Sequence, residues 1–256
     1  MGLFDDHIAQ IRKFIDSRRQ RPDVTVVAAD DVPSWPMGDS RSLVLSSDTA
    51  VELGSPKTAS TAFLVWTGDT KAVRHGRVTL VGPDIPEETR SLVPFGKTVL
   101  VNVSGFDEAN TYDRFREMEM AKYDIHPAGY MMRAVSQYQR EWSRISKKAK
   151  AGGFSLPVLG KALIEKLSAL PYVHGAEVIF VTSSADDVTA LKAVGESVGK
   201  ITGAMNKMGE EMDLDCDSCE YSPVCDSVSE LRKMRSAMQQ KKTGAPPDAE
   251  KDPHPL

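Results

Sequence analysis

The sequence is poor in cysteine, has no long apolar run and carries no excess of basic residues. Only three of its 256 residues are cysteine, an odd count that argues against a scaffold held by several disulfides. No apolar run approaches the roughly 20 residues of a membrane-spanning helix. The formal net charge of -4 gives no electrostatic reason to expect nucleic acid or an anionic membrane as partner.

The N-terminal residues lack the basic and then apolar regions of a signal peptide, so we expect a cytoplasmic protein. In a reducing cytoplasm, clustered cysteines indicate metal or redox chemistry.

All three cysteines lie in one short stretch with the spacing C-x2-C-x5-C, at Cys216, Cys219 and Cys225. Two cysteines separated by two residues can bend around one metal centre, and a turn at Pro223 would return the third thiolate to it. Iron–sulfur clusters and zinc are the usual occupants of such thiolate sites. The spacing therefore predicts a metal site. An iron–sulfur cluster is favoured over zinc, and plain thiols or a disulfide remain the other alternative.

A closed site needs a fourth ligand, and the sequence has no fourth cysteine. The alternatives are a nearby carboxylate (Asp215, Asp217 or Asp226), a histidine from elsewhere, a partner's residue, or an open position. The segment is also strongly acidic. Because thiolates normally need positive neighbours, we expect a cation to offset this charge.

The hydrophobic pattern divides the chain into four parts. Residues 1–22 are predicted to form an amphipathic helix, since Phe4, Ile8, Ile11 and Ile15 recur at helical spacing. Residues 23–209 are predicted to form an α+β domain, 210–240 a cysteine-cluster loop and a C-terminal helix, and 241–256 a disordered tail. The first half of the domain carries short β-type runs at 24–28, 43–45, 50–53, 62–66, 78–81 and 98–103.

The second half of the domain turns to helical patterns. Helices are predicted at 110–124, 130–150 and 156–170, and from a capping sequence at Ser184 towards Met208. A buried strand is expected at 177–182 and a last helix at 228–239. Consecutive strands without intervening helices predict a mixed or largely antiparallel sheet packed against helices.

Six short stretches, in this order along the chain, resemble the middle domain of the acetyl-CoA synthase catalytic (beta) subunit, from the anaerobic CO dehydrogenase/acetyl-CoA synthase system. They are residues 51–54, 76–85, 93–96, 142–149, 153–154 and 178–182. In that family the following segment supplies cysteines to the A-cluster, an iron–sulfur cubane bridged to a nickel site. The resemblance therefore implies a 4Fe-4S cluster at the three cysteines. The family's fourth cubane cysteine and its nickel-binding Cys-Gly-Cys are absent, so nickel is not expected.

These features lead to three hypotheses. The favoured one is an accessory, electron-transfer or docking protein of anaerobic one-carbon metabolism that carries an iron–sulfur cluster and meets a partner in a CO dehydrogenase/acetyl-CoA synthase or corrinoid-protein complex. The second is a subunit of an acyl- or methyl-transferring metalloenzyme whose site a partner completes. The third is a zinc-stapled interaction module. A complete acetyl-CoA synthase reaction by this chain alone is not expected.

The resemblance also implies a link to coenzyme A, which has phosphates and an adenine ring. Basic and aromatic side chains suited to such a ligand fall within the helix predicted at 130–150. They are Arg133, Arg140, Trp142, Arg144, Lys147 and Lys148. The favoured interpretation is nevertheless a solvated basic helix face with Trp142 in the core.

Overall fold

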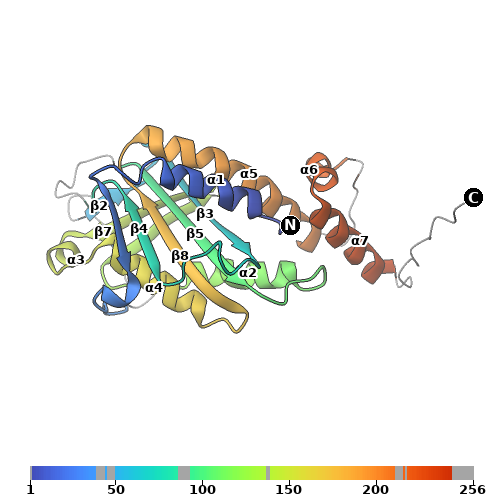
Figure 1. Cartoon of the computed structure of the whole chain (residues 1–256), viewed down its shortest axis with the longest axis horizontal. Coiled ribbons are helices and arrows are strands. Elements are labelled where there is room, and N and C mark those ends of the chain that lie inside the picture. Colours follow the sequence, from blue (N-terminus) through green and yellow to red (C-terminus); the bar gives the residue numbers. More distant parts are fainter. Residues whose placement is uncertain are drawn as a thin grey trace, which may run out of the picture.

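The computed structural model describes residues 2–38, 44, 50–85, 93–136, 139–210, 216 and 218–243. Figure 1 shows an α+β architecture in which helices cover a twisted sheet and two short helices lie beyond one end of it. The predicted fold class is therefore confirmed. The strand predicted at 43–45 falls almost wholly outside the described residues, as do Asp215, Asp217 and the predicted tail beyond Thr243.

The main sheet has five strands in the order β1-β4-β8-β5-β3. These are β1 (Val24–Ala28), β3 (Ser60–Thr67), β4 (Arg77–Val81), β5 (Phe95–Val103) and β8 (Val173–Val181). The sheet is mixed, because β3 is parallel to β5 and β4 to β8, whereas β1 with β4 and β5 with β8 run antiparallel. Every residue of β3 and β5 is buried, as expected for strands covered on both faces.

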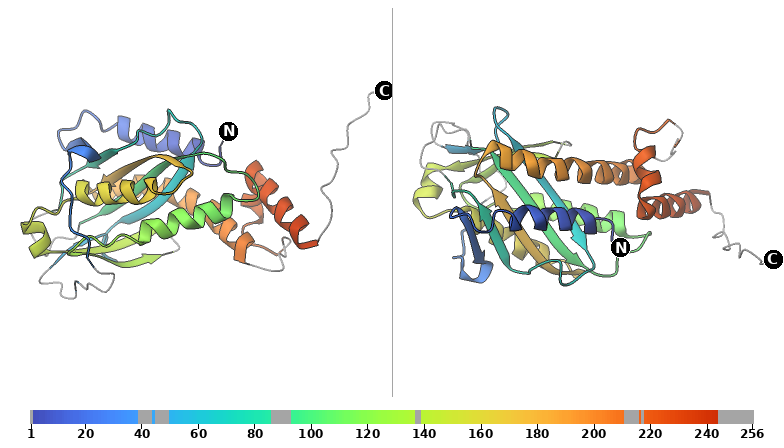
Figure 2. Two further views of the ribbon diagram at one scale, coloured as in Figure 1. Left: turned by 90° about the horizontal axis from the view of Figure 1, so that it is seen from below. Right: turned by 45° about the horizontal axis from the view of Figure 1, so that its top comes forward.

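Helices cover both faces of this sheet. Helices α1 (Asp5–Asp16) and α5 (Ala185–Glu210) lie side by side over one face, and α2 (Thr111–Tyr123) and α4 (Leu156–Ser168) over the other (Figure 2). Gly195 of α5 explains one close contact, because a Cβ there would lie 2.8 Å from Cδ1 of Phe63 in β3. The glycine thus allows α5 to approach the sheet closely.

The prediction of a helix at 130–150 is wrong. This segment forms β6 (Tyr130–Ser136) and β7 (Arg140–Ser146), which with β2 (Ala50–Leu53) make a three-stranded antiparallel sheet, followed by the short α3 (Lys147–Ala151). Gln139 enters β7 with a left-handed backbone, φ 56°. In β7 the residues that share the face of Ile145 are Glu141 and Ser143, and both are buried. A buried strand face built from polar residues has no hydrophobic alternation for sequence analysis to detect.

The polar groups on the buried face of β7 have partners in both sheets. Glu141 pairs with Lys97 of β5, and both side chains are about 2% exposed or less. The hydroxyl groups of Tyr130 and Ser143 donate to Glu141 Oε1 at 3.1 and 3.0 Å. Burial lowers the pKa of Lys97, and the charge of Glu141 opposes that shift. The pair joins the two sheets inside the protein.

The N-terminal helix is held to the domain by ion pairs as well as by its apolar face. Arg12 of α1 binds the fully buried Glu177 of β8 through two hydrogen bonds of 2.7 and 2.5 Å. Beyond the end of the helix, Arg18 and Arg21 bind Asp187 at 2.8 and 2.7 Å. The basic cluster after α1 is therefore used internally, at least by these two arginines.

Replacing Lys97 with methionine should destabilise the protein by about 3–5 kcal/mol, because the Glu141 carboxylate would stay buried without its cation. The double variant Lys97→Met/Glu141→Gln removes both charges and should recover most of that loss. Urea unfolding followed by circular dichroism measures both. A loss below about 1 kcal/mol for the single variant would show that the pair does not hold the sheets together.

Asp187 should make stability depend on acid pH. Its burial raises the pKa, but hydrogen bonds from Ser183, Arg21 and Arg18 outweigh this and hold the pKa at about 2. A lowered carboxyl pKa contributes stability above the unfolded value, which is lost as pH falls from about 4 to about 2. Asp187→Asn should cost about 1–2 kcal/mol at neutral pH and flatten the acid limb of the stability curve. An unchanged acid limb contradicts the assignment.

Candidate cysteine site

The three cysteines line one small pocket at the end of α5. Two further helices, α6 (Ser222–Ser227) and α7 (Ser229–Thr243), follow the first two cysteines in the chain and pack on that end of α5. Cys225 lies in α6 and is buried at 5% exposure, and Cys216 and Cys219 are half-buried. The remaining walls come from α5, α6, α7 and the adjoining loop, at Ala204, Lys207, Met208, Tyr221, Ser222 and Arg235.

Two basic side chains share this pocket with the thiols. Lys207 comes from α5 and Arg235 from α7. They place positive charge on the walls of the pocket, and Arg235 also pairs with Asp226. The sequence analysis did not single out either residue, because only the packing of α7 against α5 brings them to the cysteines.

Asp226, one of the predicted carboxylate ligands, binds Arg235 instead in this structure. Arg235 Nη2 donates to Asp226 Oδ1 at 2.9 Å, and the aspartate side chain is 59% exposed. Its assignment as a metal ligand stays a prediction.

The thiols are close enough to influence one another electrostatically. Burial raises the pKa of Cys225, Arg235 acts in the opposite direction, and negative charge on Cys219 or Cys216 would raise this pKa further. Within the described ranges, no three Cys, His, Asp or Glu side chains lie close enough together to hold a metal ion. Cysteine thiolates are suitable donors for a metal centre, but in this structure the three thiols would have to draw closer together to bind one.

The residues considered for coenzyme A are only partly brought together. Arg133 of β6 and Arg144 of β7 both stack on the Trp142 ring, at 4.5 and 5.8 Å from its centroid. Arg144 also donates to Glu52 Oε1 at 2.6 Å, which offsets its charge. Arg140 donates to the Thr58 carbonyl at 3.2 Å. These contacts leave coenzyme A binding a prediction.

Lys147 and Lys148 lie in α3 and are exposed. They belong to a different element from the Arg133–Trp142 stack, so the predicted single basic helix face does not exist.

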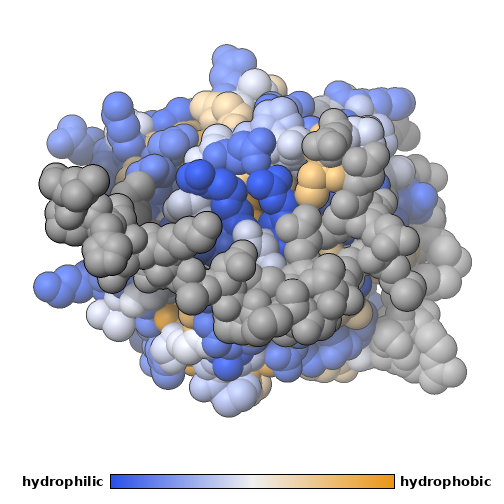
Figure 3. Space-filling model, turned by 90° about the vertical axis from the view of Figure 1, so that its right-hand side faces the viewer, coloured by the Kyte–Doolittle hydropathy of each residue, from blue (hydrophilic) through white to orange (hydrophobic). Residues whose placement is uncertain are grey.

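The end of the molecule that carries α7 is mostly hydrophilic on the surface visible in Figure 3, with small separate hydrophobic patches. A search of the described helices found none with the length and apolar character needed to cross a membrane.

Comparison with known proteins connects this fold to one family. The family model for the CO dehydrogenase/acetyl-CoA synthase complex beta subunit matches residues 40–187, more than half of the chain. The chain belongs to this family. The match ends before the cysteine pocket, so family membership by itself assigns no role to the three thiols.

Curated relatives support the same family. The acetyl-CoA decarbonylase/synthase complex subunit beta of Methanothermobacter thermautotrophicus is 31% identical over 191 residues, which cover 71% of this chain and 40% of the relative. Subunit beta 1 of Methanosarcina mazei is 26% identical over 181 residues, or 68% of this chain and 37% of the relative. The chain thus spans about two fifths of the length of these two relatives.

In the metal-free protein, Cys225 should react with iodoacetamide at least about tenfold more slowly than Cys216 and Cys219, because it is buried and its pKa is raised. Trypsin leaves all three cysteines in one peptide, residues 208–232, so fragmentation of this peptide by tandem mass spectrometry over time measures the rate at each position. The Cys225→Ser variant identifies the slow site and serves as the control. Equal rates at all three positions would contradict the pocket.

Proposed function

We propose that this chain is an accessory protein of a CO dehydrogenase/acetyl-CoA synthase system that holds an iron–sulfur cluster at Cys216, Cys219 and Cys225. It would pass electrons to, or dock onto, a protein of that system. The observation that carries the proposal is the convergence of the three thiols on one pocket. Membership of the beta-subunit family supplies the metabolic setting.

The chemistry of the pocket supports a cluster. Three thiolates bring three negative charges into a partly buried site, and Arg235 and Lys207 provide positive charge on the same walls. Iron–sulfur clusters are held by cysteine thiolates, and hydrogen bonds and charge around the sulfurs tune them. When bound, the cluster would supply one-electron chemistry. The residues of this chain would hold it, shield Cys225 from water and offset its charge.

Nickel is not part of the proposal. All three cysteines of the sequence are used by this pocket, which leaves no second pair of thiolates in these residues for a nickel ion. The proposal therefore assigns cluster binding and docking to this chain and leaves acetyl transfer to a partner.

The test is metal and acid-labile sulfide analysis of anaerobically purified, reconstituted protein. We expect about three to four irons per chain with matching sulfide, and a brown colour with broad absorption near about 400 nm. Replacing the three cysteines with serine should abolish all three signals. A protein that holds neither iron nor sulfide would overturn the cluster proposal.

Asp226→Asn provides a matched control within the same pocket. If the aspartate only pairs with Arg235, iron content should stay at the wild-type level. A loss of about one iron per chain would instead assign it as the fourth ligand. A colourless protein with one zinc per chain would instead indicate a structural zinc site. Removing the zinc should then unfold α6.

A further inference from the structure

Strand β1 forms an open edge of the main sheet. It is the last strand in the sheet order and pairs only with β4. Figure 1 shows it on the outer side of the sheet, at the end of the molecule opposite α6 and α7. Its residues are half-buried or exposed, and the Val26 side chain is 49% exposed. An open strand edge with exposed apolar side chains is a ready site for pairing with another strand.

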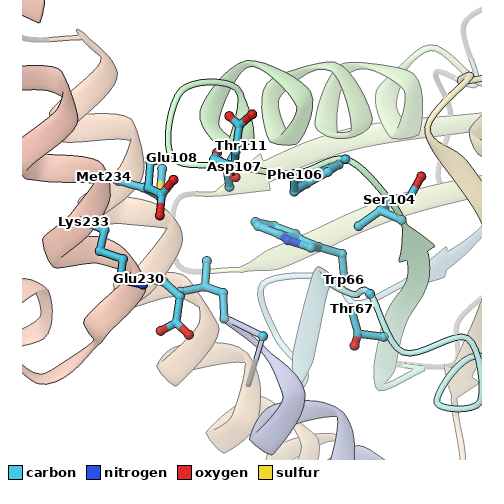
Figure 4. Close-up of a pocket in the computed structure, with 15 residues that line it drawn as sticks. Trp66, Thr67, Ser104, Phe106, Asp107, Glu108, Thr111, Glu230, Lys233 and Met234 are labelled. Atoms are coloured by element: carbon cyan, nitrogen blue, oxygen red, sulfur yellow. Dashed lines mark hydrogen bonds between the residues drawn. The ribbon is translucent and has the colours of Figure 1, made fainter.

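The other edge of the sheet, formed by β3, is covered. Every residue of β3 is buried, and the Ala62 N–H donates to the Gln139 carbonyl beside the second sheet at 2.7 Å. At the carboxyl end of β3, the loop after β5 brings Phe106 to a centroid distance of 5.8 Å from Trp66, and α7 brings Met234 to the same cavity (Figure 4). In the part of the chain that the structure describes, β1 is therefore the edge of this sheet that can accept a further strand.

The backbone of β1 presents hydrogen-bonding groups outward at alternate residues. On the β4 side, the Asp23 carbonyl accepts a backbone hydrogen bond of 2.9 Å and the Ala29 N–H donates one of 2.6 Å. In an antiparallel ladder, residues that bind the neighbouring strand alternate with residues whose N–H and C=O groups point away from it. The odd-numbered residues therefore bind β4. The N–H and C=O groups of Val26 and Ala28 point away from the sheet, as does the carbonyl of Val24.

The side chains of β1 suit a second copy of the same strand. A two-fold axis at Val26 sets two β1 strands antiparallel, so that Val26 lies beside Val26 of the copy and Val24 beside Ala28. Thr25 then lies beside Val27 on the opposite face. This register uses all three outward-facing residues of each copy. β-Branched neighbours are favourable cross-strand pairs, and β1 contains no charged residue that would face its own copy.

The charges that flank β1 complement each other in this register. The turn before β1 contains the exposed Arg19, and the residues just after β1 include the exposed Asp30 and Asp31. Within the described residues, none of these three side chains makes an ion pair. Arg77 of β4, beside the acidic end, already faces Glu177 at 3.7 Å. Because antiparallel pairing sets the start of one strand beside the end of the other, the basic turn of each copy approaches the two aspartates of its partner.

We propose that β1 pairs with β1 of a second copy of this chain around a two-fold axis at Val26, so that the two main sheets become one continuous sheet. The edge and the cysteine pocket lie at opposite ends of the molecule (Figure 1), so the dimer leaves both pockets accessible and does not depend on a bound cluster. A short strand of five residues makes a small interface, which fits a reversible dimer.

Sedimentation velocity of the full chain under reducing conditions tests the dimer, at concentrations from about 5 to about 500 µM. We expect the mass to rise from one chain of 28.0 kDa towards two, with a Kd of about 100 µM. Val26→Lys places like charges side by side at the axis and should weaken the dimer at least about tenfold. Met120→Lys, at a similarly exposed position on α2, is the matched control and should leave the Kd unchanged.

Amide hydrogen exchange followed by NMR locates the contact in the unmodified chain. The N–H groups of Val26 and Ala28 should exchange about threefold more slowly at about 500 µM than at about 20 µM, because they are bonded only in the dimer. The Val27 N–H binds β4 at every concentration and is the internal control. A chain that stays monomeric at about 500 µM overturns the proposal. So does a dimer that Val26→Lys leaves intact, or exchange at Val26 and Ala28 that does not depend on concentration.

Discussion

The ion pair between Lys97 and Glu141 joins the two sheets inside the protein, beside the apolar contacts that Leu53 and Ile145 make with the same core. Lys97 lies on β5, between β8 and β3 in the main sheet, and Glu141 lies on β7 of the smaller sheet. The backbone around Glu141 is tied to the main sheet as well, since Ser60 of β3 donates to its carbonyl at 2.6 Å and accepts from its N–H at 3.1 Å. Removing one charge would leave the other buried, which is the costly state for such a pair. Losing one charge of the pair is therefore more costly to this junction than losing both.

Helix α5 connects the folded core to the cysteine pocket. Its first turn is held through Asp187, which the arginines after α1 bind, and its middle packs on β3 through Gly195. Its last turns carry Lys207 and Met208 into the wall of the pocket. The thiols thus sit on the far end of a helix whose near end and middle are fixed to the core, and α6 and α7 close the pocket from outside.

Sequence patterns predicted most of the elements because local rules governed them. The apolar spacing of α1, the Ser155 and Ser184 caps of α4 and α5, and the β-branched runs of the main sheet each carry a local signal. The prediction for residues 130–146 failed because the buried face of this hairpin is polar. The residue that pairs with it, Lys97, also lies far away in sequence. Arg235 was missed for a similar reason, since it reaches the cysteines only when α7 packs on α5. The cysteine cluster was visible in sequence, but its positive neighbours were not.

The account rests most on the claim that the three thiols hold iron in the pocket between α5, α6 and α7. Crystals grown without oxygen and measured on both sides of the iron absorption edge test it directly. The account predicts a strong anomalous peak of iron within bonding reach of Cys216, Cys219 and Cys225, about 2.3 Å from each sulfur for a thiolate-bound metal. A pocket without an anomalous peak, or with a peak only at the zinc edge, would contradict it.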